Sequence, residues 1–239
     1  MPSRSTLKSA RREQETAASL TRSAKHPTGI KALDEILAGG LPQGQISEIV
    51  GPISSGKAGL LLRILSETTS RGERVALVDP FHTFDPVSAA EAGLDLSFLL
   101  WVRSQEQDID NRLQQAFKAT DILVRSETFC LVALDLEKPQ MGDSRGGVSQ
   151  TIPFNSWFRI KKTLQGKKIS VLVLSTRPAA GSAAALVLGL ERRFVKWKAP
   201  SSTPDSNPPR HTRLLQGLCS EVRLLRGKRH GRVTLHCSV

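Results

Sequence analysis

Residues 51–58 have the residue types and spacing of a loop that binds phosphate. Gly51 and Gly56 allow the backbone to curl so that successive amides point inward, and Lys57 can reach the β- and γ-phosphates of a nucleotide. An apolar run precedes this loop and a leucine-rich run follows it, which predicts a strand and then a helix. The helix N-terminus adds its positive dipole end to the site. The candidate nucleotide ligands are Gly51, Pro52, Ile53, Ser54, Ser55, Gly56, Lys57 and Ala58.

The magnesium part of such a site is incomplete. The pattern requires Ser or Thr after the lysine, whose hydroxyl holds Mg²⁺, and this sequence has Ala58 there, which offers no side-chain oxygen. A second element is present, because the apolar run 129–134 ends in Asp135, and a carboxylate at the end of a strand typically holds the Mg²⁺ shell. We therefore expect this loop to bind the phosphates of a nucleotide, leave Mg²⁺ binding open, and assign no metal ligand.

The net charge of +12 is unevenly distributed along the chain. Residues 29–144 carry a net charge of −7, whereas residues 145–190 contain seven Lys/Arg and no acidic residue. This asymmetry favours a polyanionic partner, most simply nucleic acid, over a surface that is basic only for solubility. The candidate DNA-binding residues are Arg145, Arg159, Lys161, Lys162 and Arg177.

Aromatic residues lie among these basic positions, and they have two interpretations. Phe154, Trp157 and Phe158 could stack on the bases of single-stranded DNA, or they could form the core face of a helix. Trp197 lies between two lysines and has the same alternatives. His82 has no paired base in the sequence, so we expect a structural role for it.

The elements that must position these residues alternate between strands and helices. Apolar runs predict strands at residues 46–50, 74–79, 98–102, 129–135 and 169–174, and helical spacing predicts helices at 87–92, 109–124 and 157–164. Ribbon strands are expected at 191–198, 214–219, 221–225 and 232–237. The predicted fold is α/β, with a mostly parallel sheet, helices on both faces and a C-terminal antiparallel β-ribbon.

The chain divides into a mobile basic arm, residues 1–26, and one core domain, residues 27–239. Residues 200–210 have the composition of a disordered loop, and Thr28 is expected to cap a short helix. The N-terminal segment has no apolar run of the kind that a secretory signal needs, and no run is long enough to span a bilayer. Cys130, Cys219 and Cys237 show no metal-ligand spacing, and Cys130 is expected in the core, so a cytoplasmic protein is predicted.

The order of these motifs resembles the bacterial RecA family from about Thr28 to Val239. The motifs that carry this resemblance are the phosphate loop and the segments 79–86, 141–144 and 223–228. The resemblance implies a P-loop NTPase core that binds ATP and single-stranded DNA and assembles into oligomers. It also implies that Asp85 contacts adenine and that Arg226 and Lys228 reach the ATP of a neighbouring subunit.

The departures from that family cluster at the catalytic machinery. The family's magnesium hydroxyl falls on Ala58, and its water-activating glutamate falls on Phe81, whose ring cannot accept a proton. Its γ-phosphate-sensing glutamine falls near Thr176, and the aromatic residue expected against adenine is Ser88. The sequence also stops at Val239, where the family continues into a C-terminal domain.

A RecA-like scaffold with a degraded site is similar to the ImuA family of short RecA-like proteins. That resemblance implies an accessory of damage-induced translesion synthesis with little ATP hydrolysis, whose expected partners are a RecA filament, a translesion polymerase or a second copy of the chain. The alternatives are an active DNA-dependent ATPase of homologous recombination and the SOS response, and a nucleotide-sensing or structural P-loop protein with no DNA role. Whether the protein is an enzyme stays open at this point.

Overall fold

The computed structural model describes residues 24–138, 154–198, 214–227 and 231–238. The arm at residues 1–23, the predicted loop 200–210, Arg145 and Lys228 lie outside the described residues. Within the described part, no helix is long and apolar enough to cross a membrane.

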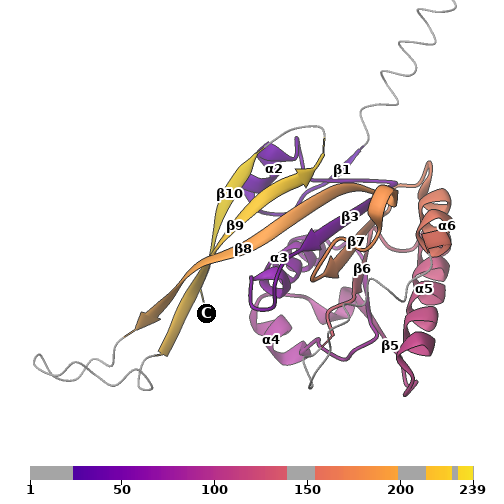
Figure 1. The fold of residues 1–239 in the computed structure, drawn as a ribbon, viewed down its shortest axis with the longest axis horizontal. Coiled ribbons are helices and arrows are strands. Elements are labelled where there is room, and N and C mark those ends of the chain that lie inside the picture. Colours follow the sequence, from indigo (N-terminus) through magenta and orange to yellow (C-terminus); the bar gives the residue numbers. More distant parts are fainter. Residues whose placement is uncertain (1–23, 139–153, 199–213, 228–230, 239) are drawn as a thin grey trace, which may run out of the picture.

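An eight-stranded sheet forms the centre of the fold, in the order β10-β9-β8-β3-β7-β6-β4-β5. The pairs from β8 through β3 to β5 are parallel, and β8, β9 and β10 pair antiparallel. The predicted fold class is therefore confirmed (Figure 1). The strands are β3 Ile46–Val50, β4 Val75–Asp79, β5 Leu99–Arg103, β6 Leu131–Asp135, β7 Ser170–Ser175, β8 Ala184–Lys198, β9 Leu214–Arg226 and β10 Arg232–Ser238.

Helices cover both faces of the sheet, because successive side chains of a buried strand point to opposite faces. In β6, Val132 and Leu134 belong to the core under α5 and α6, whereas Leu131 and Ala133 belong to the core under α2, α3 and α4. Figure 1 shows α5 and α6 side by side on one face, apart from α3 and α4. The helices are α2 Lys31–Ile36, α3 Lys57–Ser70, α4 Pro86–Glu91, α5 Ile109–Ser126 and α6 Phe154–Leu164, with short 3-10 helices at Leu96–Phe98 and Gly181–Ala183.

The end of the predicted arm belongs to the fold. Strand β1, Lys25–His26, pairs antiparallel with β2, Leu41–Pro42, and His26 is buried, so its pKa is lowered to about 4 mainly by loss of solvation. The prediction for Thr28 was wrong. Its hydroxyl does not cap α2 but donates to Asp34 Oδ1 at 2.7 Å, and the helix begins after Ile30 without a side-chain cap.

The ribbon differs from its prediction. Strand β8 begins at Ala184 rather than at residue 191, and its first part runs parallel to β3 before the strand extends beyond the helices (Figure 1). The two strands predicted at 214–219 and 221–225 are the single strand β9. The small residues at the start of β8, Ala184 and Ala185, have low strand propensity. A Cβ atom at Gly189 would lie 2.8 Å from the side chain of Leu225, so the exposed Leu225 side chain would have to move to admit one.

Candidate nucleotide site

The phosphate loop lies between the end of β3 and Lys57, the first residue of α3, as predicted. Strands β8 and β9 pack closely against this loop. A Cβ atom at Gly51 would lie 2.3 Å from the Leu190 carbonyl oxygen, and Gly56 has a φ of +94° with the Ser220 hydroxyl close to it. The Ser220 hydroxyl also donates to the Ser55 carbonyl oxygen at 2.7 Å. The first amides of α3 have no partner within the helix, so they can meet a phosphate.

A cavity of about 710 Å³ opens over this loop. Its walls come from the loop itself, the segment that follows β4, the end of β6 with the segment after it, and the ribbon strands β8 and β9. The lining residues beyond the loop are Thr83, Asp135, Glu137, Lys138, Arg192, Val195, Trp197 and Leu218.

Lys57 is turned back onto the protein. Its ammonium group donates to the carbonyl oxygens of Gly51 and Pro52, the latter at 2.9 Å, and lies 3.2 Å from Glu137 Oε1. The residue is only 2% exposed. The carboxylate of Glu137 therefore holds the lysine in the way that a nucleotide phosphate would.

Asp135 lies at the end of β6 beside the loop, as predicted, and it is buried. Its Oδ2 accepts from the Thr83 hydroxyl at 2.8 Å, and its Oδ1 accepts from the Glu137 amide at 2.9 Å. Burial is the largest cause that raises the pKa of Asp135, to about 6. The Thr83 hydroxyl also reaches Asp79 Oδ1 at 3.3 Å, so Thr83 links the ends of β4 and β6.

These residues fit a nucleotide phosphate better than they fit Mg²⁺. The loop, the start of α3 and Lys57 supply amides and a positive charge for an anion. For Mg²⁺ the site offers the carboxylates of Asp135 and Glu137 and the Thr83 hydroxyl, but these groups already bond within the protein, Thr83 to Asp135 and Glu137 to Lys57. Ala58 contributes no side-chain oxygen. Mg²⁺ prefers a full set of oxygen ligands in octahedral geometry.

Phe81, where the family's glutamate was expected, has its side chain in the core rather than in the site. It is 7% exposed, belongs to the hydrophobic cluster under α5 and α6, and is not among the residues that line the cavity. The carboxylates that line the cavity are those of Asp135 and Glu137.

Two residues that the resemblance assigned to the nucleotide lie away from the cavity lining. Asp85 is exposed and accepts bonds from the amides of Val87 and Ser88 at the start of α4, and the Ser88 hydroxyl is the largest cause that lowers the pKa of its carboxyl group. Arg226 donates to the carbonyl oxygens of Gly181 and Ala184 in its own chain.

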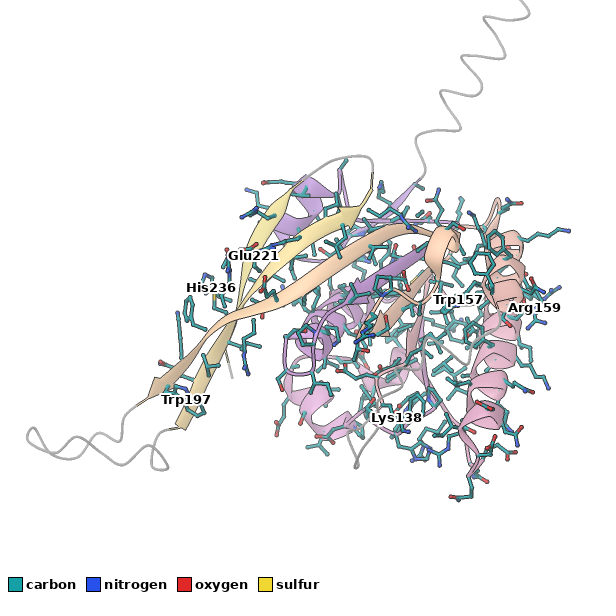
Figure 2. The ribbon with its side chains drawn as sticks, in the orientation of Figure 1. Lys138, Trp157, Arg159, Trp197, Glu221 and His236 are labelled. Carbon is teal, nitrogen blue, oxygen red and sulfur yellow. The ribbon has the colours of Figure 1, made fainter. Side chains whose placement is uncertain are left out.

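The candidate DNA-binding residues that the structure describes occupy two places. Arg159, Lys161 and Lys162 lie on α6, where Figure 2 shows Arg159 pointing outward. Arg177 is exposed just after β7, whose Ser175 carbonyl oxygen accepts from the Gly51 amide at 3.3 Å, so it lies near the phosphate loop.

The aromatic residues of α6 divide between the two interpretations. Trp157 is buried and meets the Phe117 ring edge-on, with 4.7 Å between the ring centroids, so it is a core residue. Phe154 and Phe158 are 55% and 39% exposed and contact each other beside Lys161. Trp197 is exposed on the ribbon, at the edge of the cavity.

Other single residues have simpler outcomes. His82 Nε2 contacts the Ser104 carbonyl oxygen at 2.6 Å, which agrees with a structural role. Cys130 precedes β6, is partly buried and packs against the core under α2, α3 and α4, so it lies at the margin of the core rather than inside it. The sequence interpretation missed Glu137 and Arg192 as residues of the site. Glu137 could have been suspected from its position two residues after Asp135, but Arg192 reaches the cavity only because β8 crosses over the loop.

Comparison with known proteins gives one family match. The model of the RecA N-terminal domain matches residues 14–139, which include the phosphate loop, Asp135 and Glu137. Protein RecA of Streptomyces ambofaciens is 34% identical over 159 residues, covering 62% of this chain and 41% of the relative. Protein RecA of Prochlorococcus marinus strain MIT 9303 is 39% identical over 118 residues, covering 49% and 30%. The chain thus spans about two fifths or less of the length of these relatives.

Proposed function

The chain belongs to the RecA family, and on this premise we propose that it is a DNA-repair accessory that binds nucleotide and single-stranded DNA with little ATP hydrolysis. Its role is the ImuA-like one, in which it brings a translesion polymerase to damaged DNA. The observation that supports this proposal is the set of residues that line the cavity over the phosphate loop. The loop and Lys57 are retained, whereas Phe81 lies in the core and Ala58 offers no magnesium ligand.

ATP turnover tests the proposal. A positioned general base contributes roughly 10²–10⁴-fold to a rate, so hydrolysis without the family's glutamate is expected to stay near background. The measurement is phosphate release by the purified chain, with and without single-stranded DNA, and a Lys57→Ala variant serves as the control for contaminating ATPase. Turnover that DNA stimulates to the level of an active recombinase, and that Lys57→Ala removes, would refute the accessory role.

A second candidate function is an active DNA-dependent ATPase, and one observation favours it. Glu137 places a carboxylate in the cavity, 3.2 Å from the lysine of the phosphate loop. In this alternative, Glu137 rather than residue 81 orients the attacking water. Glu137→Gln then lowers turnover, which distinguishes the two functions.

Single-stranded DNA is proposed to bind along α6. Its exposed side combines Arg159, Lys161 and Lys162 with the rings of Phe154 and Phe158, and such cations and aromatic rings are the groups that hold a single strand. Changing the three basic residues to Gln removes three phosphate contacts. The slope of log affinity against log salt is expected to become shallower by about 2, at about 0.7 per contact.

Fluorescence anisotropy with a labelled oligonucleotide across a salt series measures that slope. The matched control changes Lys31, Arg63 and Lys118, three exposed cations on α2, α3 and α5, to Gln, which gives the same net charge. Equal slopes in the two triple variants would show that α6 is not the binding surface.

The expected partners follow from the same family membership. We propose that the chain docks on a RecA filament or on a second copy of itself through the end of β9 that carries Arg226. Sedimentation of the full chain with and without nucleotide, DNA and RecA tests this, and identical sedimentation in every mixture would remove the docking proposal.

A further inference from the structure

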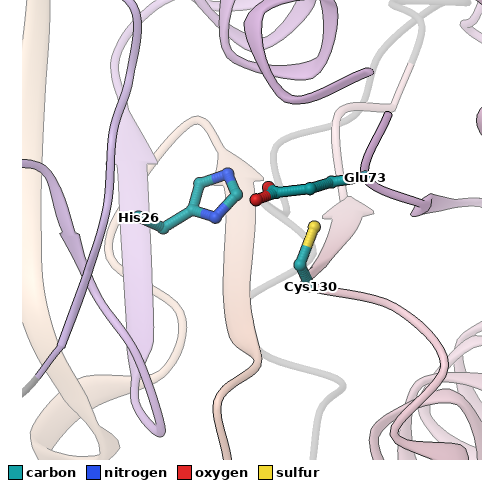
Figure 3. Close-up of side chains that lie close together, drawn as sticks. All are labelled: His26, Glu73 and Cys130. Atoms are coloured by element: carbon teal, nitrogen blue, oxygen red, sulfur yellow. The ribbon is translucent and has the colours of Figure 1, made fainter. Parts of the chain in front are cut away.

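Three side chains of metal-binding type converge at the end of the sheet where the parallel strands begin, which is the end opposite to the phosphate loop. His26 comes from β1, Glu73 from the turn before β4, and Cys130 from the residue before β6. Figure 3 shows the three side chains pointing toward one another, and one ligand atom from each lies within 4.8 Å of the others. We propose that His26, Glu73 and Cys130 bind one divalent transition-metal ion of the zinc class.

The fold fixes His26 tightly. Its strand pairs with β2, and Gly40, with a φ of +119°, passes so close that a Cβ atom would lie 2.1 Å from the His26 carbonyl oxygen. The ring Nε2 lies 2.8 Å from the Thr68 hydroxyl oxygen, and that hydroxyl donates its only proton to the Ile64 carbonyl oxygen at 2.6 Å.

This hydrogen-bond chain assigns the tautomer of His26. Because the Thr68 hydroxyl has no second proton to give, it must accept from the histidine, so Nε2 carries the ring proton. Nδ1 then keeps a free lone pair, which is what a metal requires. Ligating histidines commonly have their second nitrogen oriented by such a hydrogen bond.

Backbone bonds hold the other two residues side by side. The Cys130 amide donates to the Arg74 carbonyl oxygen at 3.1 Å, which places Cys130 next to Glu73, and the Ser170 amide donates to the Cys130 carbonyl oxygen at 2.9 Å. Both side chains are only partly buried. They can therefore move by the ångström or so that separates the present spacing from the roughly 3.5 Å between ligands of a tetrahedral zinc ion.

The ligand set indicates the class of metal. Imidazole nitrogen, thiolate sulfur and carboxylate oxygen together suit Zn²⁺ and exclude a preference for Mg²⁺ or Ca²⁺, which take oxygen ligands. Cys130 releases its thiol proton to solvent as the sulfur–metal bond forms. An open depression of about 710 Å³, lined by Glu73 and Cys130, gives water access to the fourth coordination position.

Two existing contacts compete with the metal. The Arg71 guanidinium lies 3.1 Å from Glu73 Oε2, and the Cys130 thiol donates to the Arg74 carbonyl oxygen at 3.2 Å. Arg71 also pairs with Glu67 Oε1 at 3.2 Å, so it keeps a partner when Glu73 turns to the ion. The metal would join β1 to the starts of β4 and β6, at a site independent of nucleotide and DNA binding.

Cobalt titration of the full, reduced, metal-free chain tests the proposal, because Co²⁺ takes zinc sites and reports thiolate ligation by a near-ultraviolet charge-transfer band. One Co²⁺ per chain is expected, with that band, and Zn²⁺ should displace it. Cys130→Ser should remove the band, whereas the control Cys237→Ser should keep it. No band in the unaltered chain, or the same band in Cys130→Ser, would overturn the proposal.

Two further variants keep the test independent of folding defects. Arg71→Gln removes the competing cation and leaves the three proposed ligands unaltered, so it should tighten Co²⁺ binding several-fold. Glu73→Gln removes a proposed ligand and should weaken Co²⁺ binding. Zn²⁺ should also raise the melting temperature of the unaltered chain but not that of Glu73→Gln. Binding that is unchanged in both variants would place the ion elsewhere and refute the assigned ligands.

Discussion

Replacing Glu137 with Gln is expected to strengthen ATP binding about tenfold to a hundredfold. ATP can use Lys57 only after the lysine leaves Glu137, and the carboxylate also repels the phosphates that approach it. A hydrogen bond to a charged group is worth about 1.5–3 kcal/mol, which corresponds to a factor of roughly ten to a hundred in affinity. Gln keeps the shape of the side chain but not its charge.

Calorimetric titration with ATP, with and without Mg²⁺, measures this change. Glu127→Gln is the matched control, because Glu127 forms an exposed ion pair with Lys167 outside the nucleotide cavity, and its loss should leave ATP affinity unaltered. Lys57→Ala should abolish the gain when it is combined with Glu137→Gln. Unchanged affinity in Glu137→Gln would mean that Glu137 does not compete with phosphate.

The same variant separates the two functions proposed for the chain. If Glu137 only occupies the lysine, its replacement raises affinity and leaves hydrolysis near background. If Glu137 orients water, its replacement lowers turnover, and the active ATPase becomes the better description.

The parts of the site that depend on residues close together in the sequence were predictable from it. The phosphate loop is one continuous segment whose glycines, lysine and flanking apolar runs carry the signal, and Asp135 ends an apolar run in the same way. The parts that depend on the fold were not. The contact between Lys57 and Glu137 spans 80 positions of the sequence. It joins the start of α3, which follows β3, to the segment after β6, and β3 and β6 are not adjacent strands.

The same limit explains the ribbon and the cluster at the opposite edge. The first residues of β8 are small residues of low strand propensity, and pairing with β3 makes them a strand. His26, Glu73 and Cys130 have no common spacing in the sequence. Glu73 and Cys130 meet because the starts of parallel strands gather at one end of the sheet, and the separate pairing of β1 with β2 brings His26 to them. Trp157 and Phe158 are adjacent in sequence and equally aromatic, and the helix period alone sends the first into the core and the second outward.

Asp135→Asn is expected to make the nucleotide-free protein more stable by about 2 kcal/mol near neutral pH. Burial raises the pKa of Asp135 from 3.8 to about 6, so the folded state prefers the protonated form. Ionisation therefore costs stability as the pH rises from about 4 to about 6, and the cost is constant above that range. A rise of about two in the pKa corresponds to at most about 3 kcal/mol in the free energy of unfolding.

Asparagine can keep the local bonds without the charge. Its oxygen can accept from the Glu137 amide, and its amide group can donate to the Thr83 hydroxyl oxygen, which then donates to Asp79. Urea unfolding at about pH 7.5 and about pH 4 measures the difference, which should be present at the higher pH and absent at the lower one. A variant that is less stable than the unaltered chain at about pH 7.5 would contradict the argument.

Asp95→Asn is the control of opposite sign. Asp95 is exposed and accepts hydrogen bonds from the Ser97 hydroxyl and amide, which lower the pKa of its carboxyl group. The ionised carboxylate therefore stabilises the folded state above the ordinary pKa of aspartate, and this stabilisation is lost as the pH falls through the lowered pKa. Its replacement should destabilise the protein near neutral pH. If Asp135→Asn stabilises under the same conditions, the chain keeps a buried carboxylate beside the phosphate loop at a cost in folding, as expected where a binding site still requires the charge.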